Sequence, residues 1–388
     1  MYARSAEPAL RRLLGWYPVV VIAGPRQSGK TTLVRACLPE MPYASLEDPD
    51  LRGFAAADPR GFLARYPDGA VLDEVQRAPE LFSYVQTRVD ETGRSGQFVL
   101  TGSQQFGLHS GVAQSLAGRA GALTLLPFTI AEVAPHRPAL AVEDYLLHGL
   151  YPPVHDRRIP PHVWFSDYVA TYVERDVRQL TNVRDLAAFH RFVQLCAARS
   201  GQLLNLSALA ADAGITHPTA QAWIGVLEAS HLVMRLMPHH SNLGKRLTKA
   251  PKLYFLDVGL AAWLAGVRDV TPLRWGALRG PLFETLVVGE LVKHIRNGLM
   301  PHSLSFWRTH GGHEVDVLVS GPEGLLAVEV KSGLTVAADA IRPLDALSTL
   351  VPGLRRAVVY AGDTGDRRGD VEIVPWWAVG TLLEPTRA

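Results

Sequence analysis

The strongest chemical signal in the chain is the segment Gly24-Pro25-Arg26-Gln27-Ser28-Gly29-Lys30-Thr31-Thr32. It matches the pattern G-x-x-x-x-G-K-T between a β-branched run and residues at helical spacing, which is the context of a phosphate-binding loop, or Walker A motif. The glycines lack a Cβ, so backbone N–H groups can curl around a triphosphate. A helix that begins near Lys30 points its positive end at the same anion. We therefore expect this segment to bind ATP.

Two side chains of this loop and two later carboxylates are expected to hold the phosphates and a metal ion. Lys30 would reach the β- and γ-phosphates, and the Thr31 hydroxyl would bind Mg²⁺. The apolar strand 70–74 ends in Asp73 and Glu74, which is a Walker B pattern. Asp73 would hold the Mg²⁺ shell, and Glu74 would orient and activate the attacking water. The alternative is an ordinary turn after a buried strand.

The elements that must position these groups form an α/β fold. Further strands are expected at 42–46, 98–103 and 122–128, with helices between them. This alternation implies a parallel sheet with helices on both faces and a site at the carboxyl ends of the strands. Thr101 and Ser103 lie at the same edge and predict a γ-phosphate sensor, although capping of the next helix is the alternative.

Taken in order, the motifs GPRQSGKTT, VLDEVQ, VLTGSQQ and LAGRA followed by LPFTIAEV resemble a family of prokaryotic AAA+-type P-loop ATPases. The resemblance covers nearly the whole chain, and the C-terminal half of that family is a domain of unknown function. It implies an ATP-hydrolysing homo-oligomer in which a basic residue from a neighbouring subunit completes the site. Arg119 is the candidate for this arginine finger, and a plain surface arginine is the alternative; Arg175 and Arg178 are weaker candidates.

The middle of the chain divides into a helical lid at 136–188 and a winged helix-turn-helix at 189–275. Helices at 189–200, 206–214 and 216–230, followed by strands at 232–237 and 252–256, are typical of a winged helix. The tip between the strands carries a basic cluster that would contact DNA phosphates, formed by Lys245, Arg246, Lys249 and Lys252. The presumed recognition helix has no Lys or Arg, so nonspecific DNA contact and pure protein contact stay open, and base-specific readout is disfavoured.

The last segment, 276–388, resembles the PD-(D/E)XK nuclease fold. Asp316 lies on one strand of an expected hairpin, Glu329 and Lys331 share a face of the other, and a preceding helix carries Glu284. Position by position, the resemblance makes Asp316 and Glu329 metal ligands, Lys331 the catalytic lysine and Glu284 the helical acid. No proline precedes Asp316, which is a departure from the pattern. Three interpretations stay open: an active nuclease, a catalytically degenerate nuclease, and an amphipathic hairpin whose polar face is only exposed to solvent.

Composition sets the outer limits. The 388 residues suggest several domains, taken here as an ATPase domain at 1–135 and the three segments above. The 47% hydrophobic and 20% charged content is that of a soluble globular protein, and the net charge of +2 says nothing about partners. Two distant cysteines, Cys37 and Cys196, fit a reducing compartment, and no run reaches the length of a membrane span, so we expect a cytoplasmic protein.

Two functions of different class remain. The first is an ATPase that couples its nucleotide state to action on DNA through the winged-helix and nuclease-like domains. The second is a nucleotide-controlled switch or scaffold that binds protein partners with a catalytically dead nuclease fold.

Overall fold

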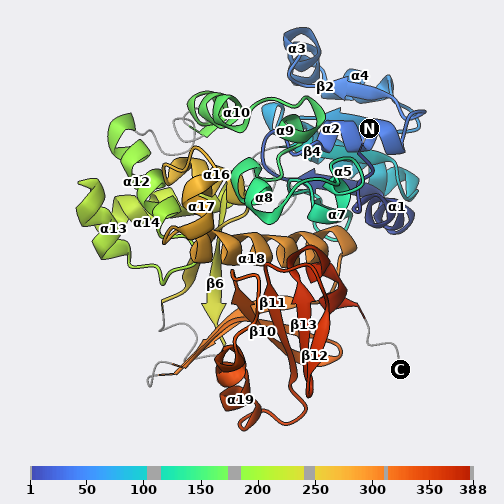
Figure 1. Cartoon of the computed structure of the whole chain (residues 1–388). Coiled ribbons are helices and arrows are strands. Elements are labelled where there is room, and N and C mark those ends of the chain that lie inside the picture. Colours follow the sequence, from blue (N-terminus) through green and yellow to red (C-terminus); the bar gives the residue numbers. More distant parts are fainter. Residues whose placement is uncertain (1, 103–114, 174–184, 240–249, 310–312, 385–388) are drawn as a thin grey trace.

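The structure is a computed structural model that describes residues 2–102, 115–173, 185–239, 250–309 and 313–384. Figure 1 shows the N-terminal unit in blue, the middle helices in green beside it, and the C-terminal sheet in orange and red. One long helix, α18 (Arg279–Gly298), lies between the C-terminal sheet and the rest of the molecule. Among the described residues, we find no helix whose length and apolar character would let it cross a membrane.

The N-terminal sheet is fully parallel, as predicted. Its strands follow the order β2-β3-β4-β1-β5, and every neighbouring pair is parallel. Their bounds are β1 (Val19–Ala23), β2 (Tyr43–Ser45), β3 (Ala70–Asp73), β4 (Phe98–Gly102) and β5 (Ala120–Thr124). Because Val19 and Ala70 both pair with Phe98, the central strands run level, and their carboxyl ends meet at one edge.

Helices cover both faces of this sheet because its side chains alternate between them. Val20 and Ile22 join one core with Leu10 and Leu33, whereas Val19 and Val21 join another. The first core belongs to α1 (Glu7–Trp16) and α2 (Lys30–Cys37). The second is covered by α3 (Pro49–Ala57), α4 (Pro59–Ala64) and α5 (Leu81–Thr92). A short 3₁₀ turn, η1 (Val75–Arg77), follows β3.

The middle of the chain is helical and ends in an antiparallel hairpin. Short helices come first: α7 (Ile130–Val133), α8 (Val142–His148), α9 (Pro152–Asp156), α10 (Pro161–Tyr168) and a π-helical turn, η2 (Val169–Val173). Next come α12 (Leu186–Ala198), α13 (Leu206–Ala213), α14 (His217–Ala229) and the paired strands β6 (Val233–Pro238) and β7 (Lys252–Phe255). The predicted boundaries hold here: Gly214 ends α13 with φ 72°, and the Thr216 hydroxyl accepts a hydrogen bond from Thr219 N at the start of α14.

After α16 (Val258–Leu264) and α17 (Thr271–Trp275), helix α18 leads into the C-terminal strands. These are β8 (Ser303–Arg308), β9 (Glu314–Gly321), β10 (Gly324–Lys331), β11 (Arg355–Tyr360), β12 (Asp366–Arg368) and β13 (Val371–Pro375), with η3 (Ala338–Ile341) and α19 (Arg342–Ser348) before β11 and η4 (Trp376–Leu383) at the end. The predicted antiparallel pairing of β9 with β10 is confirmed.

The hairpin does not stand apart from the C-terminal sheet. Strand β6 pairs with β8 as well as with β7, so one eight-stranded sheet runs in the order β12-β13-β11-β10-β9-β8-β6-β7. A single hydrophobic core extends from Leu126 to Leu383. The middle helices and the C-terminal sheet therefore share one hydrophobic core, although the sequence motifs predict them as separate domains.

Candidate functional site

The phosphate-loop residues adopt the curled backbone that the glycines predict. Gly29 has φ 91° and caps the start of α2. A Cβ on Gly24 would lie 2.1 Å from Leu125 O, so no other residue fits there without displacing β5's continuation. The Lys30 ammonium donates to Gly24 O at 3.0 Å and Pro25 O at 2.9 Å. Lysine and loop therefore form one compact unit at the end of β1.

Asp73 is held by three hydroxyl groups at the carboxyl edge of the sheet. Thr31 Oγ1 donates to Asp73 Oδ2 at 3.0 Å, and Tyr43 OH donates to the same oxygen at 2.5 Å. Thr101 Oγ1 donates to Asp73 Oδ1. Burial and the adjacent Asp73 carboxylate raise the pKa of Tyr43, so Tyr43 acts as a donor here. Three predicted residues, Thr31, Asp73 and Thr101, are thus brought together, and Lys30 precedes Thr31 in the chain.

Glu74 is turned away from its neighbour by an unusual backbone. It has φ 55°, in the left-handed region that non-glycine residues occupy at a cost of about 1 kcal/mol or more. Its N–H donates to Thr101 Oγ1 at 3.4 Å, and Gln76 Nε2 donates to Glu74 Oε2 at 2.5 Å. The two adjacent carboxylates therefore have different partners, three hydroxyl groups at Asp73 and the Gln76 amide at Glu74.

The donor set at this edge fits magnesium. Mg²⁺ prefers hard oxygen ligands and binds through one or two protein groups together with substrate phosphates. The Thr31 hydroxyl and the Asp73 carboxylate supply such oxygens next to the phosphate loop. Ser103, the other sensor candidate, lies outside the described residues, as do Arg175, Arg178, Lys245, Arg246 and Lys249.

Arg119 lies at the opposite edge of the sheet from Lys30. Strand β5 begins at Ala120, which pairs with Val19 at the amino end of β1. The Arg119 guanidinium forms an ion pair with Asp90 on α5, with Nε 2.5 Å from Oδ1, and about a third of its side chain is exposed. Arg119 therefore cannot complete the site of its own chain, and its role in a neighbouring subunit stays a prediction.

Two side chains that hold the phosphate loop in place could not be predicted from the sequence around the loop. The Arg4 guanidinium donates to Ser28 O at 2.7 Å and to Leu126 O at 2.8 Å, and it lies over the Phe128 ring. Trp164 Nε1 on α10 donates to Gln27 Oε1 at 3.1 Å. Both partners come from distant parts of the chain, so only the folded structure reveals them.

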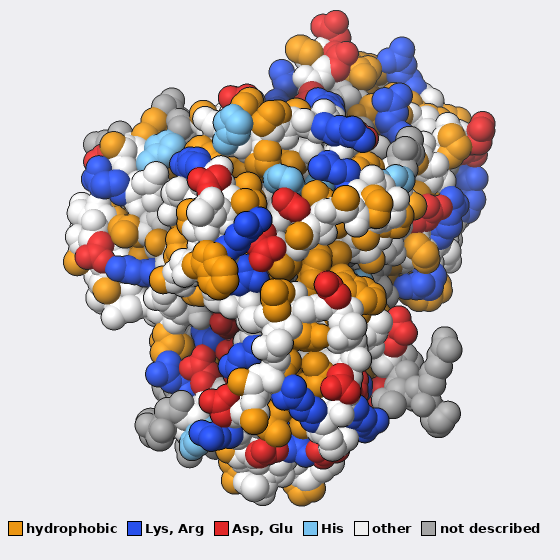
Figure 2. Space-filling view, viewed as in Figure 1, with side chains coloured by type: hydrophobic (Ala, Val, Ile, Leu, Met, Phe, Trp, Pro, Cys, Tyr) orange, Lys and Arg blue, Asp and Glu red, His pale blue; other side chains and the backbone are white. Residues whose placement is uncertain are grey.

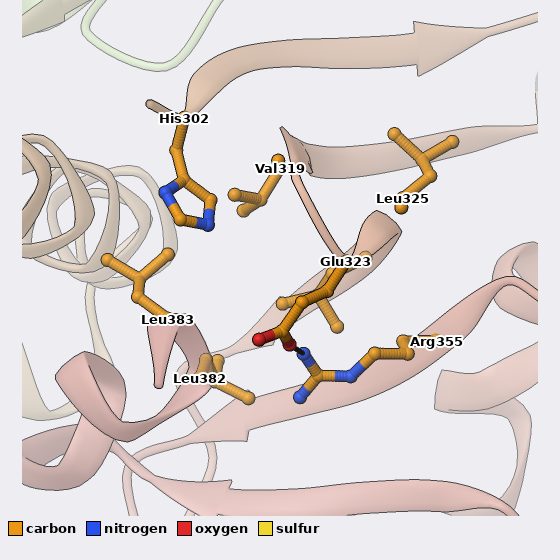
Figure 3. A pocket seen from close by; sticks show the side chains of 10 residues that line it. His302, Val319, Glu323, Leu325, Arg355, Leu382 and Leu383 are labelled. Carbon is orange, nitrogen blue, oxygen red and sulfur yellow. Dashed lines mark ion pairs between the residues drawn. The ribbon is translucent and has the colours of Figure 1, made fainter. Parts of the chain in front are cut away.

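A cavity of ≈ 340 Å³ opens beside the loop. The residues that line it come from the N-terminal segment, α2, the stretch after β5 and helix α9, and they include Tyr2, Arg4, Gly29, Thr32, Phe128 and Pro152. Its volume lies in the range of small-molecule pockets. A second cavity, shown in Figure 3 between His302, Leu382 and the Glu323–Arg355 ion pair, measures only ≈ 20 Å³. That is room for about one water, so we do not treat it as a ligand site.

The nuclease-like residues also come together, on α18, β9 and β10. Lys331 Nζ lies 2.6 Å from Glu329 Oε1, and Val330 N donates to Asp316 Oδ2 at 2.8 Å. Burial raises the pKa of Asp316 well above its usual value, and the neighbouring Glu284 and Glu329 raise it further. Burial likewise raises the pKa of Glu329. The three acids therefore form a crowded, desolvated cluster.

Lys252 lies inside this acidic cluster, and its prediction as a phosphate contact is wrong. Its ammonium is 3.0 Å from Glu284 Oε1, 2.6 Å from Glu314 Oε1 and 3.8 Å from Asp316 Oδ1. Pairing of Lys252 with Leu236 turns the side chain into the structure, where it is 3% exposed. Among the described residues, no group of three or more His, Cys, Asp or Glu is arranged to hold a metal ion. The cluster therefore holds the Lys252 ammonium among the carboxylates that the nuclease resemblance assigns to a metal, and their role as ligands stays a prediction.

Comparison with known protein families places three matches along the chain. Residues 17–134 match the family described as AAA domain. Residues 140–271 and 279–379 match two families described as domains of unknown function, DUF8612 and DUF4143.

Two curated relatives match nearly the whole chain. They are "Uncharacterized protein Rv2008c" of Mycobacterium tuberculosis and "Uncharacterized protein Mb2031c" of Mycobacterium bovis, each 30% identical over 363 residues, covering 93% of this chain and 80% of the relative. Among solved structures, the Walker-type ATPase PABY2304 of Pyrococcus abyssi is 15% identical with a TM-score of 0.45, covering 68% of this chain and 96% of that one. A likeness this weak carries no argument.

Proposed function

The chain belongs to the same family as the mycobacterial proteins Rv2008c and Mb2031c and carries an AAA-type P-loop ATPase domain, and we propose that it hydrolyses Mg²⁺-ATP to control its C-terminal half. Nucleotide binding and hydrolysis are the general activity of such a domain. The finer assignments, which are the individual residues, the partner and the oligomer, are our proposal.

One observation carries the proposal: next to Lys30 in the chain, Thr31 donates to Asp73, and Thr101 donates to the same carboxylate and accepts from Glu74 N. When a triphosphate binds, Lys30 would exchange the loop carbonyls for phosphate oxygens. Magnesium would supply charge neutralisation of the phosphates. Asp73 and Thr31 would hold it, and Glu74 would orient the attacking water. The cavity beside Thr32 has the size for the nucleobase.

We propose DNA as the partner of the C-terminal half. Three helices followed by the β6–β7 hairpin support a winged helix, and the basic tip residues Lys245, Arg246 and Lys249 would contact phosphates without reading bases. On the face shown in Figure 2, Lys and Arg side chains are interspersed with acidic and apolar ones. This face therefore has no continuous basic surface along which a long stretch of DNA would bind.

Helix α18 supports a physical connection between the two halves. Glu290 on α18 accepts a hydrogen bond from Ile130 N at 2.9 Å, next to the ATPase unit. Glu284, on the same helix, belongs to the acidic cluster. A nucleotide-dependent shift of the ATPase unit would therefore reach the cluster through one element.

The test is ATP turnover by the wild type, Lys30→Ala and Glu74→Gln, each with and without duplex DNA. Lys30→Ala should lose binding and turnover, whereas Glu74→Gln should still bind ATP and lose turnover by about a hundredfold or more. Turnover that survives Lys30→Ala would refute the site. If the rate of ATP turnover does not change with DNA, the ATPase proposal stands and the proposal that DNA is the partner is refuted.

A specific observation favours a second candidate, a nucleotide-controlled switch or scaffold that binds protein. Lys252 neutralises the acidic cluster, and α14 contains no Lys or Arg. The two candidates differ in salt dependence. If DNA is the partner, its affinity should fall steeply between low and physiological salt and weaken in a Lys245→Ala/Arg246→Ala/Lys249→Ala variant. If the protein is instead a switch that binds protein partners, it is expected to show no DNA affinity at any salt concentration.

A further inference from the structure

Lys252 connects two parts of the fold that the sequence places far apart. It is the first residue of β7, and its ammonium lies among carboxylates of α18 and β9. The residues in question are Glu284 on the helix and Glu314 and Asp316 on the strand. Lys252 is 3% exposed, whereas the side chains of Glu284, Glu314 and Asp316 are 17%, 26% and 15% exposed, so the ammonium is the buried part of the contact. A buried ammonium is stable only where carboxylates surround it closely.

Each of the three predicted metal ligands already has a protein partner on at least one of its carboxylate oxygens. Tyr254 OH donates to Glu284, Val330 N donates to Asp316, and Lys331 lies 2.6 Å from Glu329. Arg308 adds a cation 3.3 Å from Glu314 Oε2. Four carboxylates thus face three cations, Lys252, Lys331 and Arg308. The charge is nearly balanced without any added ion.

A divalent ion beside Lys252 would face strong repulsion. Mg²⁺ needs the lone pairs of several oxygens at about 2.1 Å. Two oxygens of this cluster, Glu284 Oε1 and Glu314 Oε1, already lie 3.0 Å and 2.6 Å from the Lys252 ammonium. Two cations a few ångströms apart repel each other more strongly in a desolvated site than in water. Glu329 Oε2 is buried and has no hydrogen-bond partner among the described residues, so this oxygen would be open to such an ion if Lys252 were gone.

We propose that Lys252 is the resident cation of this cluster, that it anchors the β6–β7 hairpin to α18 and β9, and that it keeps divalent metals away from Asp316, Glu329 and Glu284. The inference does not depend on ATP hydrolysis. It bears on the choice between the two candidate functions, because a metal-free cluster cannot use the metal-dependent chemistry of the nuclease fold that the chain resembles.

The test is Mn²⁺ binding, read from the electron paramagnetic resonance signal of the free ion. All proteins carry Lys30→Ala and are measured without nucleotide, and a Mn²⁺ site is assigned to the acidic cluster only if Asp316→Asn removes it, because that change leaves Thr31 and Asp73 of the ATP site in place. The Lys30→Ala parent should show no Mn²⁺ site that Asp316→Asn removes. Adding Lys252→Met should create a site at least tenfold tighter than any in the parent, and adding Asp316→Asn to that variant should abolish it.

Lys293→Met is the matched control. Lys293 is also a buried lysine, 2.8 Å from Glu290 on the same helix, but it lies outside the acidic cluster. Its replacement should create no Mn²⁺ site. If Lys252→Met does not fold because it strands buried carboxylates, Lys252→Met/Glu314→Gln relieves one charge and takes its place.

Two outcomes would overturn the proposal. A parent protein that binds Mn²⁺ at a site removed by Asp316→Asn would show that Lys252 does not keep metal out. A folded Lys252→Met variant that gains no site would show that something else does.

Discussion

Arg4 and Glu132 form a buried ion pair, with Arg4 Nε 3.2 Å from Glu132 Oε2, that connects the chain ahead of α1 to the start of α7. The same carboxylate accepts from Ser5 N at 2.6 Å and from Thr129 N at 2.9 Å. Since the Arg4 guanidinium also holds Ser28 O, this pair is part of the support behind the phosphate loop.

Arg4→Met should destabilise the protein and weaken nucleotide binding. Loss of the guanidinium leaves Glu132 buried without its cation, which costs about 3 kcal/mol in unfolding free energy. ATP affinity should fall as well, because Ser28 O loses its donor. Urea unfolding and calorimetric titration with ATP measure the two effects. Arg11→Met, which removes the exposed ion pair with Glu7, is the control and should change little. Equal effects at both arginines would contradict the assignment.

Thr101→Val should damage catalysis more than folding. The change keeps the shape of the side chain and removes the hydroxyl that donates to Asp73 and accepts from Glu74 N. We expect kcat for ATP to fall about tenfold, corresponding to about 1.4 kcal/mol, together with a higher Mg²⁺ requirement. Steady-state rates over a Mg²⁺ series provide the measurement. Thr87→Val, on the exposed side of α5, should leave both quantities unaltered.

Gly24→Ala should abolish nucleotide binding. The added Cβ would come within 2.1 Å of Leu125 O, so loop or strand must move. The comparison is Gly53→Ala in the middle of α3, where a Cβ meets nothing within 4 Å. That substitution should stabilise the protein by about 0.5–1 kcal/mol and leave ATP affinity unchanged. Retained ATP binding in Gly24→Ala would show that the loop is looser than its backbone indicates.

Arg119→Ala tests assembly. If Arg119 serves a neighbouring subunit, the variant should bind ATP normally and lose turnover by tenfold or more. Mixing it with excess Lys30→Ala protein should restore part of the turnover, because hybrid interfaces then pair an intact loop with an intact finger. Asp90→Ala, which removes the ion-pair partner of Arg119 within the chain, should keep activity. A monomeric protein in sedimentation experiments would end this line of argument.

His155 predicts acid sensitivity. Burial lowers its pKa to about 4, although its Nε2 bonds Gly149 O at 2.8 Å. Between pH 6.5 and 4 the unfolded chain binds a proton that the folded chain refuses, so the unfolding free energy falls as the pH drops through this window, by on the order of 3 kcal/mol. Denaturant unfolding at several pH values measures this slope. His155→Gln should flatten it, whereas a change at the exposed His162 should not.

The ATPase unit was predictable because its signals are local. A strand, a glycine loop and a helix follow one another in sequence, and Asp73 ends a run that only a buried strand explains. Arg4 could not be found this way, since its partners Ser28 and Leu126 lie 24 and 122 residues away. Tyr43 begins a strand that sequence does predict, but its bond to Asp73 depends on the order of strands in the sheet.

Lys252 shows where local reasoning fails. A lysine near a loop with other basic residues predicts an exposed cation, and the structure buries it. Lys252 is buried because β6 pairs with β8 and because α18 packs beside it. Neither contact can be predicted from the residues close to Lys252 in the sequence. The acids Asp316 and Glu329 were correctly predicted as neighbours because a hairpin fixes them locally.

Helix α18 has 20 residues, so it is a rod of about 30 Å. Its C-terminal end touches the N-terminal segment through Asn297 and Ser5, and its first turns carry Glu284. A tilt at one end therefore becomes a displacement at the other, amplified by the length of the lever. A cross-link that prevents this helix from tilting would therefore uncouple the two halves of the molecule without changing either site.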